Sequence, residues 1–192
     1  MKHSFIFLAP GFEEIEALAT VDVLRRAEMT VITVAVTDCG KTVEGAHGVK
    51  VEADIHLNDA DLSNAEWLIC PGGMPGAANL AADKKVCAAL TDQFKKGGKI
   101  AAICASPALV LEPLGILAGR EATCYPGMEG HIKTGIFQES PVVAHPTLIT
   151  GNGPATTLRF ALAIVRNTKG DDKAEEVGSA MLYYSKSSEF YF

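Results

Sequence analysis

Short apolar runs alternate along the chain with longer stretches of helical spacing. Four runs are mainly apolar or β-branched, as strands buried on both faces of a sheet are: residues 3–9, 30–36, 66–71 and 99–104. Apolar positions three and four residues apart predict helices at residues 13–27, 83–96, 155–167 and 171–184, with a short helix at 107–117. Strands that alternate with helices favour an α/β fold with a parallel sheet covered on both faces.

The other segments are less regular. Alternating residues around two glycines predict a hairpin over residues 41–53, and two short strands are expected around His145-Pro146. Residues 71–80 have the glycine and proline content of a turn, and residues 119–141 predict no clear element. We expect one domain over residues 1–184 and a loose tail at 185–192.

Three of the expected strands end in similar loops, with the sequences "APGFEE", "CPGGMPG" and "ICASP". The carboxyl ends of parallel strands share one edge of the sheet, and function gathers at that edge. If the three strands are neighbours, these loops meet.

Composition narrows the function classes. The 192 residues include 17 Lys plus Arg and 23 Asp plus Glu, a net charge of −6, and no basic run that would bind nucleic acid. No apolar stretch reaches the length of a membrane span or of a signal-peptide core, so we expect a cytoplasmic protein. Five cysteines without a C-x-x-C pair and five scattered histidines favour neither a metal site nor a disulfide framework. Phosphate-binding and dinucleotide-binding fingerprints are also missing, so no cofactor is expected.

Cys104 is the first candidate for chemistry. It stands where an apolar run stops and a helix-like stretch begins, and its neighbours Ala105 and Ser106 are small enough for a tight turn. Such an elbow projects the turning side chain from the sheet, and the following helix N-terminus would lower the thiol's pKa. The alternative is a buried cysteine that only fills space.

Two further groups belong to the neighbouring loops. The N–H groups of the "PGG" sequence at 71–73 could bind an oxyanion beside a thiolate, although an ordinary turn explains the glycines equally well. Glu13 and Glu14 fit solvated acids at a helix start, whereas Glu16 has apolar neighbours. Burial would raise the pKa of Glu16, so that it could hold or move a proton beside the thiol. In the same helix, Ala17, Leu18, Val21 and Leu24 form the expected apolar stripe.

Four motifs, in order along the chain, resemble the ThiJ/PfpI family and its DJ-one branch with bacterial members: "APGFEEIEAL", "PGGMPGAANL", "AAICASPALVL" and "GPATTLRFALAIV". The likeness runs from about residue 5 to 182. It implies a flavodoxin-like, class I glutamine amidotransferase-like three-layer sandwich and a homodimer in which helix 13–27 takes part. It also implies a reactive Cys104, a partner acid at Glu16, and backbone N–H groups at Gly73 and Ala105.

The resemblance suggests glyoxalase-like conversion of small dicarbonyls or removal of early glycation adducts, with an oxidation-sensing or chaperone-like dimer as the alternatives. Three departures stand out: Tyr125 replaces a histidine that many relatives carry, Ser106 replaces a glycine, and Ala105 excludes the protease-like branch. Gly72, Tyr125 and Pro126 are expected to line the site. Sequence spacing leaves open whether His131 or His145 reaches the thiol.

Overall fold

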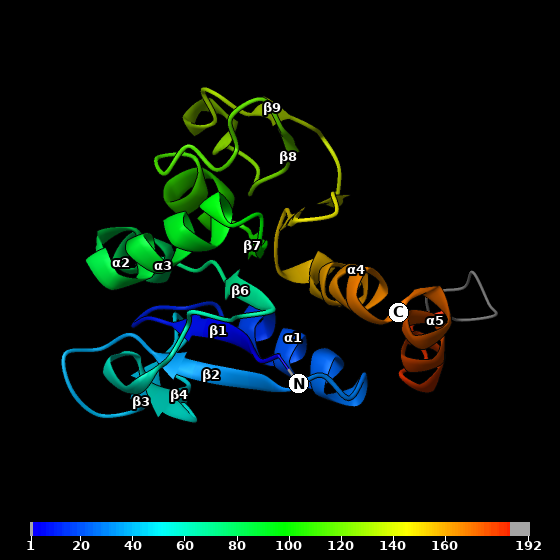
Figure 1. Ribbon diagram of the computed structural model, residues 1–192, viewed down its shortest axis with the longest axis horizontal. Helices are drawn as coiled ribbons and strands as arrows, with labels where there is room; N and C mark the ends of the chain where they lie inside the picture. Colours follow the sequence, from blue (N-terminus) through cyan, green and yellow to red (C-terminus); the bar gives the residue numbers. More distant parts are fainter. Residues whose placement is uncertain (1, 185–192) are drawn as a thin grey trace.

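The computed structural model describes residues 2–184, and a seven-stranded sheet forms its centre (Figure 1). The strands lie in the order β10-β11-β7-β6-β1-β2-β5, and every neighbouring pair is parallel except β10 and β11 at one edge. Their bounds are β1 Ser4–Leu8, β2 Val31–Ala35, β5 Ile55–His56, β6 Trp67–Cys70, β7 Lys99–Ile103, β10 Val142–Ala144 and β11 Leu148–Gly151. The four apolar runs are therefore strands, as predicted, and the two strands around His145-Pro146 are confirmed.

Each face of the sheet has its own apolar core, because successive side chains of a strand point to opposite faces. Ile6 and Leu8 of β1 belong to one core, and Phe5 and Phe7 to the other. The first core is covered by α1 Glu14–Arg26, α4 Thr157–Lys169 and α5 Asp171–Ala180. The second is covered by α2 Gly76–Ala82, α3 Lys84–Lys95 and the π-helical turn Pro107–Leu111. In Figure 1, α2 and α3 lie on the side of β6 and β7 away from α4 and α5, which is the expected three-layer, flavodoxin-like arrangement.

The first helix begins and ends where its charges indicate, but its apolar stripe was predicted incorrectly at one position. Ala17, Val21 and Leu24 are buried, whereas Leu18 is 38 % exposed. At 3.6 residues per turn, the buried face runs through Glu16, Thr20 and Val23 instead, which leaves Leu18 on the outside. One buried position on this helix is thus given to a carboxylic acid.

Smaller elements complete the description. The predicted hairpin is confirmed as the antiparallel pair β3 Thr42–Glu44 and β4 Lys50–Glu52. Within residues 119–141, for which the sequence predicts no clear element, β8 Glu121–Ala122 pairs with β9 Ile136–Phe137. Three 3-10 turns lie at Leu57–Asp59, Glu129–His131 and Pro154–Thr156. No helix within residues 2–184 is long and apolar enough to cross a membrane.

Three predicted boundaries were wrong. The helix expected at 107–117 is one π-helical turn, closed by the Glu112 N–H on Pro107 O at 3.0 Å. The turn expected at 71–80 contains the start of α2 at Gly76. The last helix ends at Ala180, because Leu182 takes a left-handed conformation with φ of 58°. The tail expected at 185–192 lies outside the described residues.

Candidate active site

The chain turns sharply at Cys104, directly after β7. Cys104 has a φ of +64°, a left-handed conformation that costs a non-glycine residue roughly 1–2 kcal/mol. Two backbone hydrogen bonds hold it there: its N–H donates to Gly151 O at 2.9 Å, and its carbonyl accepts from the Tyr125 N–H at 2.8 Å. The structure therefore has the strained elbow that the sequence predicts.

Ser106 ties this elbow to the neighbouring loop. Its buried hydroxyl donates a hydrogen bond to Pro71 O at 2.5 Å, at the end of β6. Ser106 thus fixes the Cys104 turn against the loop that carries Gly72 and Gly73.

Gly72 is the point at which Cys104 and Glu16 meet. A Cβ at this position would lie 2.5 Å from Cys104 Cβ, 2.8 Å from Glu16 Oε2 and 2.9 Å from Cys104 Sγ. The Gly72 N–H donates to Glu16 Oε2 at 2.7 Å, and Gly72 O accepts from the Glu13 N–H at 3.0 Å. Any side chain here would separate the thiol from the acid.

Gly73 also requires glycine. Its φ is +87°, and a Cβ would lie 2.4 Å from the Glu13 backbone nitrogen. In this conformation its N–H acts on the Cys104 thiol, as does the N–H of Ala105. The two N–H groups expected beside the sulfur are therefore both close to it.

Glu16 is fully buried in α1. Burial raises the pKa of its carboxyl to about 7, against the lowering effects of the Gly72 N–H and of the Cys104 side chain, while the charge of Glu13 raises it further. Among the described residues, Glu16 Oε1 has no hydrogen-bond partner. The carboxyl can thus be neutral or ionised near neutral pH.

The electrostatics of Cys104 differ from the sequence-based expectation. Burial raises the pKa of its thiol to about 12, and the charge of Glu16 adds to the rise. The N–H groups of Gly73 and Ala105 act in the opposite direction but do not outweigh burial. The expected lowering by a following helix was wrong, because only a single π-helical turn follows the elbow and Cys104 is just 8 % exposed. Glu16 and Cys104 are therefore one coupled pair, and the first proton leaves it near pH 7.

The other expected residues lie at different places. Tyr125 is 46 % exposed beside the elbow, and its ring faces Gly153, while Pro126 follows it on the surface. His131 is exposed in the turn Glu129–His131. His145 precedes the amino-terminal end of β11, whereas Cys104 follows the carboxyl-terminal end of the parallel strand β7. The Nε2 of His145 lies 3.0 Å from Glu121 O. His145 therefore does not reach the thiol.

Sequence reasoning missed a contact between His47 and the acidic start of α1. Glu13 and Glu14 were expected to be solvated, but both are buried because the β3–β4 hairpin folds over the start of α1. The His47 N–H donates to Glu14 Oε1, and His47 Nδ1 lies 2.7 Å from Glu14 Oε2. Although burial raises the pKa of Glu14, these bonds leave it below its usual value, and they raise the pKa of His47. No spacing in the sequence places a hairpin residue against a helix start 33 positions away.

Glu13, Glu14 and His47 are also the described residues that could hold a metal ion, since one ligand atom from each lies within 4.8 Å of the others. The hydrogen bonds between His47 and Glu14 already account for their arrangement.

The fold and the site together define a class, the flavodoxin-like α/β proteins with a cysteine elbow beside a carboxylic acid. Residues 2–167 match the model of the DJ-1/PfpI family, and the chain belongs to that family. The resemblance inferred from the four motifs is thereby confirmed.

Relatives extend this result. The chain is 38 % identical over 175 residues to protein DJ-1 homolog B of Arabidopsis thaliana. The matched segment is 91 % of this chain but 40 % of that protein, so the chain spans less than half of the relative's length. It is 34 % identical over 179 residues to glutathione-independent glyoxalase DJR-1.2 of Caenorhabditis elegans, and the match covers 92 % of this chain and 94 % of that protein. The crystal structure of a cysteine-to-alanine mutant of a DJ-1 superfamily protein from Salmonella typhimurium matches with a TM-score of 0.90 at 34 % identity. This match covers 96 % of the present chain and 99 % of the Salmonella chain. An enzymatic role is therefore plausible within the family.

The raised pKa of Glu16 predicts a pH dependence of stability. The folded state binds a proton up to about pH 7 that the unfolded state releases at about 4.5, so the free energy of unfolding falls as pH rises between these values. The full difference is about 3 kcal/mol, from 2.5 units at 1.36 kcal/mol each. We expect Glu16→Gln to abolish this fall, as measured by urea denaturation at pH 5 and pH 8. Glu175→Gln, at an exposed position, should keep the wild-type slope; a wild-type slope in Glu16→Gln would contradict the assignment.

Proposed function

We propose that the protein is a cysteine-dependent enzyme of glyoxalase type, which converts a small dicarbonyl such as methylglyoxal to lactate. The observation that carries this proposal is the meeting of the Cys104 thiol and the Glu16 carboxyl over Gly72, where no side chain separates them. A nucleophile next to a group that can give and take a proton is the minimum that such a reaction needs.

The reaction begins when the Glu16 carboxylate takes the proton of the Cys104 thiol and the sulfur attacks the aldehyde carbon. An S–C bond forms, the carbonyl electrons move to oxygen, and the oxyanion takes a proton from the Glu16 carboxylic acid to give a hemithioacetal. The N–H groups of Gly73 and Ala105 are the candidate donors to the oxyanion, because both already act on the sulfur.

Glu16 then moves the proton between the carbons. Its carboxylate removes the proton from the former aldehyde carbon and passes it to the ketone oxygen, which gives an enediol. As the enediol collapses, Glu16 takes the proton of the first hydroxyl and gives a proton to the second carbon, which leaves a thioester. Water hydrolyses the thioester, the C–S bond breaks, and lactate and the thiol are released. Early glycation adducts carry the same carbonyl carbon in masked form and are the related substrate class.

The test is lactate formation from methylglyoxal. Cys104→Ser should reduce the rate to background, because a hydroxyl cannot replace the thiolate as nucleophile. Glu16→Gln should reduce it by about 10²-fold or more, the usual contribution of a general acid–base group. Cys39→Ser, which changes an exposed cysteine, serves as the matched control and should retain the wild-type rate. Equal rates for wild type and Cys104→Ser would refute the proposal.

A second candidate function is oxidation sensing at the same thiol. The unpartnered Glu16 Oε1 and the N–H groups of Gly73 and Ala105 favour it, since they could hydrogen-bond oxygens added to the sulfur. The thiolate attacks a peroxide oxygen, an S–O bond forms as the O–O bond breaks, and hydroxide leaves; a second peroxide gives the sulfinic acid.

Mass spectrometry after mild peroxide treatment tests this candidate. We expect oxidation to concentrate at Cys104, because it has a partner acid and two N–H donors and is 8 % exposed, whereas Cys70 and Cys124 are 0 % and 2 % exposed. Similar oxidation of all three cysteines would exclude the sensor.

We also propose that the chain forms a homodimer through α1, whose outer side exposes Ile15 (57 %) and Leu18 (38 %). Two exposed apolar side chains one turn apart are typical of a helix face that packs on a partner. Light scattering should therefore give twice the chain mass, and Leu18→Glu should shift it toward the monomer. A monomeric mass for the wild type would contradict the proposal. A chaperone-like role stays a lesser alternative, because no described surface favours it over the dimer contact.

A further inference from the structure

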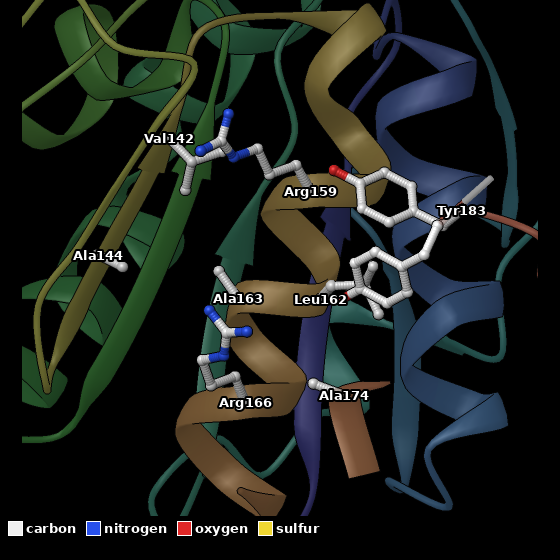
Figure 2. Close-up of a pocket in the computed structure, with 9 residues that line it drawn as sticks. Val142, Ala144, Arg159, Leu162, Ala163, Arg166, Ala174 and Tyr183 are labelled. Atoms are coloured by element: carbon white, nitrogen blue, oxygen red, sulfur yellow. The ribbon is translucent and has the colours of Figure 1, made fainter. Parts of the chain in front are cut away.

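A cavity of about 390 Å³ opens along α4, between β10 and the turn after α5 (Figure 2). Its volume lies in the range of small-molecule sites. The residues that line it include Arg159, Leu162, Arg166, Ala174, Tyr183 and Tyr184. None of the residues described as lining it belongs to the Cys104 site, so the cavity is a separate feature.

One wall of the cavity carries two arginines, although the chain has a net charge of −6. Arg159 and Arg166 both line it from α4, and no described lining residue is acidic. Arg166 Nε pairs with Asp171 at 2.6 Å, whereas Arg159 has no ion pair among residues 2–184. Asp171 thus already offsets the charge of Arg166, and the guanidinium of Arg159 is the group on this concave surface that can attract an anion.

Two tyrosine rings form the opposite wall, and the backbone fixes their position. After α5, the Leu182 N–H donates to Ser179 O and the Tyr183 N–H to Gly178 O, which is a Schellman motif. The Tyr184 ring packs on Gly178, where a Cβ would lie 2.5 Å from it. The two rings meet edge to face, with centroids 5.1 Å apart. This wall is therefore built before any ligand arrives.

Between the arginines and the tyrosines the surface is apolar. Leu162 and Ala174 are buried side chains of α4 and α5, and Ala163 lies between the two arginines in Figure 2. A ligand that fills this space needs one anionic end and a flat apolar body, because the charge lies on one wall and the rings on the other.

We propose that this cavity is a binding site for a small aromatic carboxylate. Arg159 binds the carboxylate through its two parallel N–H groups, and the ring packs against Tyr183 and the apolar surface of Leu162. The site is independent of the reaction proposed for Cys104.

The probe is 2-naphthoate, with 2-naphthalenemethanol as the neutral analogue of the same ring system. Isothermal titration should give one naphthoate site per chain and at least about tenfold weaker binding of the alcohol, because it lacks the charge-assisted hydrogen bonds. Arg159→Gln should weaken naphthoate binding by about tenfold or more, and Tyr183→Leu should weaken both probes. Arg26→Gln, which removes an equal charge from the exposed Arg26–Asp22 pair on α1, should bind naphthoate as the wild type does.

Several results would overturn the site: no binding of naphthoate, equal affinity for the alcohol, or the same loss in Arg26→Gln as in Arg159→Gln. Full displacement of naphthoate by equimolar inorganic phosphate would show an anion site without an aromatic part, and would also refute it. Cys104→Ser should bind naphthoate normally, so failure of the proposed reaction and failure of this site are distinguishable.

Discussion

The hydrogen bond from the Gly72 N–H to Glu16 Oε2 holds the first helix against the loop after β6, and the rest of the site is arranged around it. The Glu13 N–H returns a bond to Gly72 O, so the two segments are joined in both directions. Because Gly72 has no side chain, the Cys104 sulfur can approach the same carboxyl from the neighbouring strand end. The order of β1, β6 and β7 in the sheet places these three segments side by side. A different strand order would separate acid, glycine and thiol even with every local motif intact.

This arrangement costs free energy. Glu16 is buried with one oxygen that has no hydrogen-bond partner among residues 2–184, and Cys104 is held in a left-handed conformation. Neither condition would persist in a flexible loop. Three hydrogen bonds hold the elbow in place, and each fixes it to a different segment. Ser106 donates to Pro71, Cys104 donates to Gly151, and Tyr125 donates to Cys104. The apolar cores on the two faces of the sheet hold those segments in place. Strain that persists at a buried cysteine at the end of a strand is typical of a functional position.

The sequence predicted much of this arrangement, because the relevant signals are local. Apolar runs mark strands buried on both faces, and β1, β2, β6 and β7 follow them closely. The elbow at Cys104 could be predicted from an abrupt strand end with small residues after it. The pKa of the thiol could not, since it depends on burial by segments far apart in the chain. The burial of Glu13 and Glu14 was missed for the same reason: His47 reaches them from a hairpin whose position depends on tertiary packing. Leu18 was misplaced because a periodic apolar stripe does not reveal that the buried face of a helix passes through an acid.

One carboxyl must serve the proposed reaction in two opposite states. Protonating the first oxyanion requires a carboxylic acid, and removing the proton from carbon requires a carboxylate. An ordinary glutamate would be ionised nearly all the time at neutral pH and could rarely donate. Burial raises the pKa of Glu16 to about 7, where both forms are populated, so the same group can alternate between the two roles. Tyr125 stands beside the elbow, and His145 lies at the opposite end of the strands. In the proposed reaction the buried carboxyl of Glu16 therefore carries the near-neutral proton exchange for which histidine is the usual side chain.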